Sequence, residues 1–365
     1  MPALFDPLAI RGTTLPNRLA VSPMCQYSCE DGDGLATPWH HVHLGSRAVG
    51  GAGLVIAEAT AVEPRGRITP QDLGIWSATH AEALSQTASF VRDQGSVPGI
   101  QLAHAGRKAS KTRPWDGSEP LGPEAGGWEV LAPSADPWPY PAGDAPPTRE
   151  MDREDVADVI AAFRGAAEHA REAGFEVVEV HGAHGYLLHE FLSPVTNHRD
   201  DEYGGNFENR TRLAREVTEA VRDVWPDEKP VFVRLSGTDW FDDRESWTVE
   251  QSARLADVLA DAGADLIDVS SGGITPDSAP PWRGPNFQLA LAEHVRANRE
   301  SDVAVGTVGG VTTAEQADAI VRNERADLVL AARQFLRDPY FGLHAAADLE
   351  ADLDDVVPVQ YRRAF

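Results

Sequence analysis

Cysteine and long apolar runs are scarce in this sequence. Its 365 residues include two cysteines, Cys25 and Cys29, which favour neither a disulfide framework nor a zinc or iron–sulfur site. No apolar run reaches the roughly 18 residues that a transmembrane helix needs, which excludes a membrane span. The N-terminal stretch has no basic segment followed by an apolar one, so we expect no secretory signal and a cytoplasmic location.

Lysine is also scarce, although acidic residues are abundant. Only Lys108, Lys111 and Lys229 are lysines, the acidic residues number 57, and the formal net charge is -25. This charge repels nucleic acid phosphates and anionic lipid surfaces, so we expect small molecules or further copies of the chain as partners. The spread of acidic charge suggests the hypothesis of a salt-rich host. An unfolding free energy that is equal in low and molar KCl would contradict that hypothesis.

Hydrophobic residues make up 42% of the chain and gather in short runs, each followed by a Gly, Ser or His cluster and a longer amphipathic stretch. This pattern is typical of alternating strands and helices. The expected strands are Arg18–Pro23, Leu54–Ala59, Val97–Ala103, Glu176–His181, Val231–Ser236, Asp265–Ser270, Val303–Val308 and Asp327–Ala332. Such strands close most simply into a (β/α)8 TIM barrel, which we expect to form one domain over residues 1–365. A doubly wound open sheet is the alternative, but no G-x-G-x-x-G turn follows the first strand.

Two helices carry clear terminal signals, and one segment carries none. Helix 152–173 begins with acidic residues and ends at Gly174, and helix 248–262 ends in the same way at Gly263. The segment from Arg107 to Pro147 is dense in Pro, Gly and Trp and has no periodicity. We expect it to be an ordered excursion or a mobile lid over one end of the barrel, within the same domain.

Polar residues gather where the later strands end, which is where barrel enzymes place their sites. Gly309 and Gly310 follow the seventh strand and Arg333 follows the eighth, a position at which many barrels bind phosphate. A tight turn without a ligand is the simpler interpretation of the glycines alone. Arg234 ends an apolar strand and needs an anionic partner, which is either a ligand or a salt bridge to Asp265 or Asp268.

His181, His184 and Tyr186 stand together at the end of the fourth strand. The histidines can be metal ligands, neutral donors to a carbonyl oxygen, or hydrogen-bonded core residues. A metal would need a third ligand, and among the strand ends only Glu58 is acidic. Polarisation of a carbonyl group is therefore the better fit.

Several segments resemble the Old Yellow Enzyme family, and the bacterial thermophilic-like ene-reductase subgroup in particular. They are Asn17–Cys25 (NRLAVSPMC), Glu58–Thr60 (EAT), Gln101–Lys108 (QLAHAGRK), His181–Leu187 (HGAHGYL), Asp201–Gly205 (DEYGG), Glu208–Arg210 (ENR) and the tail Gln360–Arg363 (QYRR). The similarity runs from Leu4 to the C-terminus. It implies an FMN-dependent NAD(P)H oxidoreductase.

The resemblance implies that FMN is bound tightly but non-covalently. The residues expected around it are Ser22, Pro23, Met24, Cys25, Ala59, Gln101, Arg234, Gly309, Gly310, Ala332 and Arg333. Cys25 would contact the flavin edge near N5 and O4, although a small buried core residue is the alternative. Gln101 suits the pyrimidine edge, and Arg234 would face the N1 and O2 region, where negative charge accumulates on reduction.

The resemblance also implies a reaction. NADPH or NADH reduces the flavin and leaves, and an electron-poor alkene then takes its place. His181 and His184 would hold the carbonyl or nitro oxygen, Tyr186 would supply the α proton, and Tyr27 would contact the substrate from the other side. Arg363 of a neighbouring subunit, or Arg362 as the alternative, would reach into the site, so the tail 355–365 is expected at an interface of a homodimer or homotetramer.

Other activities compete with this interpretation. A dienoyl-reductase-like flavoenzyme would carry an iron–sulfur cysteine cluster and extra domains, and neither is visible in the sequence. A metal-dependent barrel hydrolase or lyase could use His181 and His184, and a barrel without catalysis could only bind a ligand. For the favoured interpretation we expect no metal.

Overall fold

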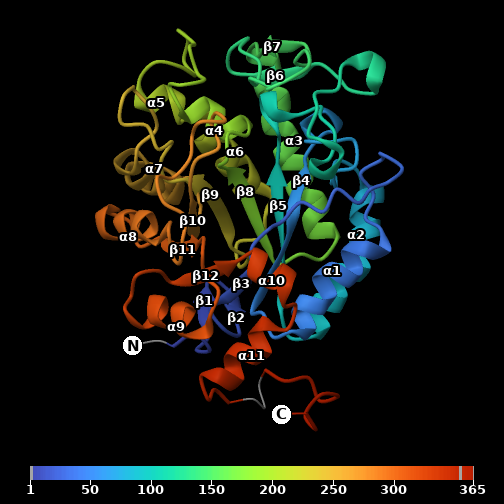
Figure 1. Ribbon diagram of the computed structural model, residues 1–365, viewed down its shortest axis with the longest axis vertical. Coiled ribbons are helices and arrows are strands. Elements are labelled where there is room, and N and C mark those ends of the chain that lie inside the picture. The colour runs from blue at the N-terminus through green and yellow to red at the C-terminus, as the bar shows by residue number, and fades with distance from the viewer. Residues whose placement is uncertain (1–2, 353–355, 365) are drawn as a thin grey trace.

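The computed structural model describes residues 3–352 and 356–364, and its centre is a closed barrel of parallel strands (Figure 1). The strands follow the order β10-β11-β12-β3-β4-β5-β8-β9 around the barrel. They are β3 (Leu19–Val21), β4 (Leu54–Ala61), β5 (Val97–Ala103), β8 (Val177–Gly182), β9 (Val231–Ser236), β10 (Leu266–Ser270), β11 (Ala304–Val308) and β12 (Leu328–Ala331). Each expected strand is present, and the (β/α)8 barrel is confirmed.

Apolar side chains close the N-terminal end of the barrel. The first residues of several strands, including Leu54, Phe232 and Leu266, form one buried cluster there. An antiparallel hairpin of β1 (Leu8–Ile10) and β2 (Thr13–Leu15), which the sequence did not predict, adds Ile10 and Leu15 to this cluster. The polar strand ends are therefore left at the opposite, C-terminal end of the barrel.

Helices surround the barrel (Figure 1). The longer ones are α1 (Pro38–Val49), α2 (Ala78–Asp93), α3 (Arg153–Glu172), α6 (Arg212–Val224), α7 (Val249–Asp261), α8 (Leu289–Asn298), α9 (Ala314–Arg322) and α11 (Phe341–Asp348), and the short ones are α4 (Leu187–Leu192), α5 (Phe207–Arg210) and α10 (Arg333–Arg337). Asp152 caps α3 and Thr248 caps α7, each with a reciprocal capping box, so both predicted helices are confirmed. Within the described residues, no helix is both long enough and apolar enough to cross a bilayer.

The excursion after β5 has structure that the sequence did not reveal. It begins in the 3-10 turn η2 (Gly106–Lys108) and contains η3 (Pro114–Asp116), η4 (Pro123–Ala125) and β6 (Val130–Ala132), which pairs in parallel with β7 (Thr148–Glu150). Trp128 ties it to the barrel mouth by donating to the Arg65 carbonyl oxygen at 2.9 Å. The segment is thus hydrogen-bonded to the C-terminal end of the barrel through Trp128.

Candidate active site

Strand register brings Arg234 to the centre of a buried charge cluster. Its Nε donates to Asp268 at 2.6 Å and lies 3.6 Å from Glu179, and a terminal nitrogen donates to Ser22 at 2.9 Å. Of the two salt bridges considered from the sequence, the one to Asp268 forms, whereas Asp265 pairs with Arg11. Although burial alone would lower the pKa of Arg234, the two carboxylates outweigh it and raise that pKa.

Glu179 is a site residue that sequence analysis missed. It accepts a hydrogen bond from Gln101 at 2.7 Å, its other oxygen has no hydrogen-bond partner among the described residues, and it is fully buried. Burial, opposed by Arg234, raises its pKa to about 8. One guanidinium thus faces two buried carboxyl groups, of which Glu179 has a raised pKa. A charged residue inside an apolar strand was the available signal.

The three expected substrate-binding residues of β8 and its turn lie together. The ring centroid of His181 is 5.1 Å from that of His184 and 5.2 Å from that of Tyr186. Burial lowers the pKa of both histidines well below 6.5 and raises the pKa of Tyr186 well above 10. At neutral pH the pair therefore offers uncharged imidazoles beside a phenol that retains its proton.

A hydrogen-bond chain orients the His184 ring, and it includes Gln288, which sequence analysis did not identify. The Gln288 amide nitrogen donates to the Val308 carbonyl oxygen at 2.7 Å and to Ser270 Oγ at 3.4 Å. Ser270 Oγ lies 2.7 Å from His184 Nε2. The contact with Ser270 holds the His184 ring in one orientation, in either tautomer.

Cys25, Tyr27 and Ala59 meet on the other side of Tyr186. The Cys25 thiol and the Tyr27 hydroxyl are hydrogen-bonded, and both residues pack against an apolar cluster that Tyr186 also contacts. Burial raises the pKa of Cys25, and the neighbouring Cys25 together with burial raises that of Tyr27, so both side chains are neutral. Ala59 follows a bulge in β4 and lines a narrow cavity with Tyr186 and Asp72.

Lys108 is a further residue to which the sequence assigned no role. Its Nζ donates to the His184 carbonyl oxygen at 2.7 Å and to that of Gly273 at 3.1 Å. It also lies 4.9 Å from the centroid of the Tyr186 ring and 4.6 Å from that of Trp138 in the excursion. Burial lowers its pKa to about 7, so the ammonium group titrates near neutral pH beside the phenol.

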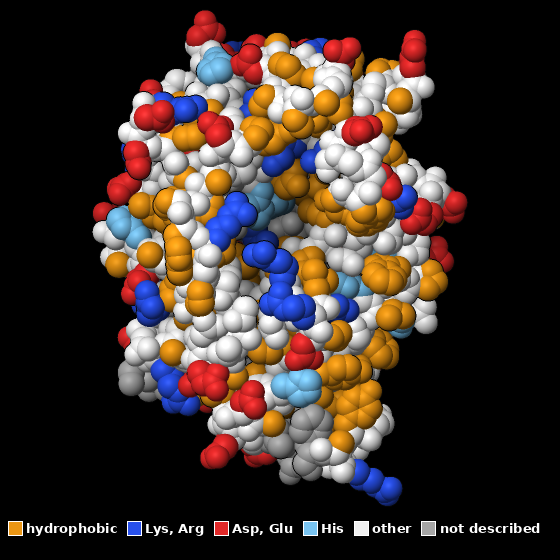
Figure 2. All heavy atoms as spheres, viewed as in Figure 1, with side chains coloured by type: hydrophobic (Ala, Val, Ile, Leu, Met, Phe, Trp, Pro, Cys, Tyr) orange, Lys and Arg blue, Asp and Glu red, His pale blue; other side chains and the backbone are white. Residues whose placement is uncertain are grey.

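A cavity of about 440 Å³ opens beside His184. The expected residues Gly309, Gly310, Ala332 and Arg333 line it, together with Arg283 and Arg337. Its described lining contains three arginines and no acidic side chain, which fits an anionic group. Figure 2 shows Lys and Arg side chains gathered around a hollow in this face of the molecule.

The remaining expected residues differ in position. Pro23 and Met24 are partly buried beside Ser22 on the segment that leaves β3. Arg363 is exposed in the tail and lines neither cavity of its own chain, so its role in a neighbouring subunit stays a prediction. Residues 355 and 365 of the tail lie outside the described residues.

Glu58 does not complete a metal site with the histidines. It pairs with His40 at 3.3 Å and accepts from the backbone of Gln26. Within residues 3–352 and 356–364, no group of three or more His, Cys, Asp or Glu side chains could hold a metal ion.

The sequence profile of the NADH:flavin oxidoreductase / NADH oxidase family matches residues 3–352. The chain belongs to this family. A family relative, NADPH dehydrogenase of Geobacillus sp. (strain WCH70), is 45% identical over 362 residues, which cover 99% of this chain and 98% of the relative. The resemblance to Old Yellow Enzymes is thereby confirmed, and with it the assignment as a flavin-dependent oxidoreductase that uses FMN and a nicotinamide reductant.

Solved structures of the family share the barrel. The old yellow enzyme homologue from Zymomonas mobilis has a TM-score of 0.77 and 27% identity, covering 96% of this chain and 93% of that chain. A 2-naphthoyl-CoA reductase has a TM-score of 0.84 and 25% identity over 97% of this chain. This chain spans only 53% of that longer family member.

Proposed function

We propose that the chain is an FMN-dependent ene-reductase, which reduces activated C=C bonds of α,β-unsaturated carbonyl or nitro compounds at the expense of NADPH or NADH. The observation that carries this proposal is the pair of neutral histidines, His181 and His184, beside a protonated Tyr186 at the mouth of a flavin-binding barrel. The name of the Geobacillus relative, NADPH dehydrogenase, supports NADPH as the reductant.

The described residues fit FMN. The arginine-lined cavity with Gly309, Gly310, Ala332 and Arg333 suits its phosphate. In the barrel mouth, Ser22–Cys25, Ala59, Gln101 and Arg234 would hold the ring system. When bound, FMN supplies hydride transfer between the nicotinamide and the alkene.

His181 and His184 would bind the carbonyl or nitro oxygen of the substrate. A neutral imidazole donates a hydrogen bond without bringing a charge, and the bond strengthens as negative charge grows on the oxygen. Ser270 holds the His184 ring, so this donor is oriented before substrate arrives. Tyr186 would deliver a proton to the α carbon, and the ammonium group of Lys108 at its ring face would stabilise the phenolate that remains.

The test is the visible spectrum of the purified protein. We expect a yellow protein that bleaches anaerobically with NADPH and recolours with cyclohexenone. In a double variant, His181→Ala with His184→Ala, we expect FMN to stay bound while binding of p-hydroxybenzaldehyde and enone turnover are lost. A colourless protein that cannot be reconstituted with FMN, or a double variant with unchanged aldehyde affinity, would contradict the proposal.

A further inference from the structure

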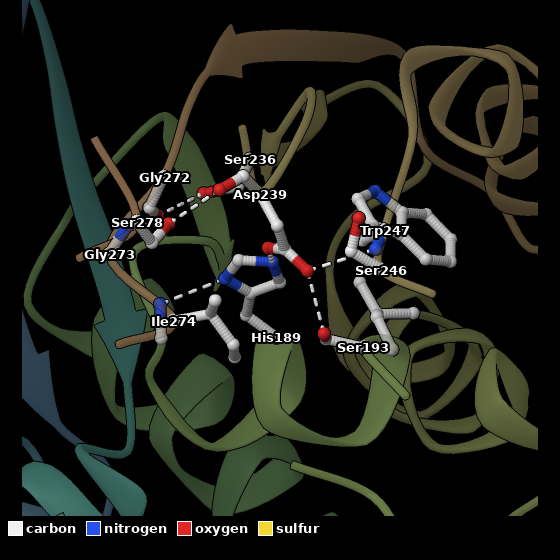
Figure 3. A network of polar contacts seen from close by, with 12 residues as sticks. His189, Ser193, Ser236, Asp239, Ser246, Trp247, Gly272, Gly273, Ile274 and Ser278 are labelled. Carbon is white, nitrogen blue, oxygen red and sulfur yellow. Dashed lines mark hydrogen bonds and ion pairs between the residues drawn. The ribbon is translucent and has the colours of Figure 1, made fainter. Parts of the chain in front are cut away.

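A buried polar pair, His189 and Asp239, contacts the turn that carries His184 and Tyr186 through the Gly185 amide. Figure 3 shows the pair and its polar neighbours. Both side chains are completely buried, and His189 Nε2 lies 3.0 Å from Asp239 Oδ1. His189 belongs to α4, whereas Asp239 belongs to the loop after β9. No step of the proposed reaction uses either side chain.

The hydrogen bonds around His189 fix its ring proton. The backbone N–H of Gly185 donates to His189 Nδ1 at 2.8 Å, so Nδ1 carries no hydrogen. A neutral imidazole then has its proton on Nε2, which is the atom that faces the Asp239 carboxylate. His189 thus accepts from the turn that carries His184 on one side and makes a close polar contact with the Asp239 carboxylate on the other.

The turn that His189 supports has a backbone conformation that is costly. His184 has a φ of 61° and Gly185 a φ of 67°, and a side chain at Gly185 would meet the Gly273 carbonyl oxygen at 2.0 Å. A non-glycine residue in the left-handed region costs about 1 kcal/mol or more and persists only where its surroundings hold it. Ser236 holds the His184 amide at 2.9 Å, and His189 holds the next amide along the chain.

Asp239 connects this support to Ser193, Trp247 and Ser278. Its Oδ2 accepts from Ser193 Oγ at 2.6 Å and from the Trp247 amide at 2.9 Å. Its carbonyl oxygen accepts from Ser278 Oγ at 2.8 Å, and Ser278 Oγ in turn accepts from the Gly273 amide at 3.1 Å. Figure 3 shows Ser193 and Trp247 beside the carboxylate and Gly273 beside Ser278. Asp239 Oδ2 is therefore satisfied by protein donors, Oδ1 faces His189 Nε2 at 3.0 Å, and the residue anchors α4 against the loops after β9 and β10.

We propose that His189 and Asp239 are positioning residues for the proposed reaction: they fix the Gly185 amide and thereby set the placement of His184 relative to Tyr186. This inference rests on the ene-reductase function proposed above. Apolar side chains could fill the same volume, but they would offer no acceptor to the Gly185 amide. The pair therefore acts through one specific hydrogen bond, and that bond can be tested separately from the packing.

Two substitutions at position 189 each keep one of the two polar contacts of the His189 ring and remove the other. In His189→Asn, the amide oxygen can take the place of Nδ1 and still accept from Gly185, but the donor to Asp239 is lost. In His189→Gln, the amide nitrogen can take the place of Nε2 and still donate to Asp239, but the acceptor for Gly185 is lost. Each variant loses one buried polar contact of the His189 ring, so each is the control for the destabilisation of the other.

The experiment uses the FMN-bound enzyme and measures three quantities: FMN content, the dissociation constant of p-hydroxybenzaldehyde from its long-wavelength band, and the rate of reoxidation by cyclohexenone. We expect both variants to keep FMN. His189→Asn should stay within about 3-fold of the parent in aldehyde affinity and reoxidation rate, whereas His189→Gln should lose at least about 10-fold in both, the effect of an unsatisfied buried amide. Reduction by NADPH should change little in either variant.

Equal losses in the two variants, or a larger loss in His189→Asn, would overturn the inference. If neither variant folds, Ser193→Ala tests the same support because it removes only one donor to Asp239. We then expect a loss of about 2- to 5-fold in aldehyde affinity with full FMN content, and an unchanged affinity would overturn the inference. Failure of the proposed ene-reductase function gives a different result from failure of this inference, because the parent enzyme itself would then not recolour with enone.

Discussion

The two halves of the candidate site differ in how the backbone places their residues. Gln101, Glu179, Arg234 and Asp268 lie on barrel strands, where the parallel register sets each position. On the substrate side, His184 and Tyr27 have φ values of 61° and 52°, so they lie on turns that no ladder supports. Strand hydrogen bonds fix the first set, whereas side chains such as Ser236, His189 and Lys108 must hold the second.

This difference predicts that substitutions in the two halves affect different properties of the enzyme. A change on the strands should affect stability and flavin binding together, because the charge cluster lies inside the barrel. A change on the turns should leave both intact and reduce only the steps that involve the alkene. Substitutions that violate this division would show that the two halves are not independent.

Arg234→Met should have the largest effect. It removes the cation between Glu179 and Asp268, and an uncompensated buried charge costs about 3–5 kcal/mol in unfolding free energy. We expect that loss in denaturant unfolding, together with loss of bound FMN measured by absorbance.

Arg215→Met is the matched control. It breaks an ion pair with Glu219 on the surface of α6, at 2.7 Å, and should cost less than about 1 kcal/mol with full FMN content. If Arg234→Met retained both the stability and the FMN of its parent, the strand cluster would not hold the cofactor.

Tyr186→Phe should affect only the substrate half. We expect reoxidation by cyclohexenone to slow by about 100-fold, the usual size of a lost general acid, while reduction by NADPH, FMN content and the unfolding free energy stay unchanged. Stopped-flow absorbance of the flavin measures both half-reactions. Equal slowing of the two would argue against proton donation by Tyr186.

The same division explains what the sequence could predict. The eight strands follow from apolar runs, and residues that end them, such as Arg234 and His181, were found because strand position fixes site position. The sequence left Asp265 and Asp268 as alternative partners of Arg234. Spacing along the chain alone does not show which of the two carboxylates lies on the same face of the sheet as the guanidinium.

The residues that sequence analysis missed act through long-range contacts. Lys108 reaches His184 across 76 positions, and Gln288 reaches Val308 from the loop before α8. The hairpin β1–β2 and the pair β6–β7 are three residues long per strand, too short for a periodic signal. Such contacts depend on tertiary packing, which no local pattern encodes.

Gly310→Ala tests whether turns on the cofactor side behave differently from turns on the substrate side. Gly310 has a φ of 74°, and an added Cβ would lie 2.2 Å from the Gly284 carbonyl oxygen, so the loop lining the arginine cavity must shift. We expect FMN affinity to fall by about 10-fold, the equivalent of about 1.4 kcal/mol, in titrations of the apoprotein.

Gly165→Ala provides the control for this change. Gly165 lies in α3 with nothing within 4 Å of an added Cβ, so the variant should bind FMN as the parent does. An unaltered FMN affinity in Gly310→Ala would show that the turn after β11 does not contribute to binding of the phosphate.

The smallest expected effect is the pH dependence that Lys108 gives to the substrate half. Its pKa is about 7 because burial, reinforced by Lys111, disfavours the ammonium form. Below pH 7 the charged group lies at the Tyr186 ring and stabilises the phenolate left by proton donation, and above pH 7 this stabilisation disappears. The reoxidation rate should therefore fall by about 3- to 10-fold as the pH rises through 7.

Lys108→Met should give a flat profile at the lower rate. His181 and His184 stay neutral and Tyr186 stays protonated across this range, so these three groups cannot produce the step. Three further buried groups titrate in this range: Asp72, with a pKa of about 7, and Glu179 and Glu190, each with a pKa of about 8. Asp72→Asn, Glu179→Gln and Glu190→Gln distinguish them, because the step should survive each change. Linkage gives an independent check: unfolded Lys108 binds a proton up to about pH 10.5 that the folded chain releases near 7, so the unfolding free energy should rise with pH between these values in the parent relative to Lys108→Met. A step near pH 7 that persists in Lys108→Met would show that another group produces it and that the charge of Lys108 does not affect the reoxidation rate.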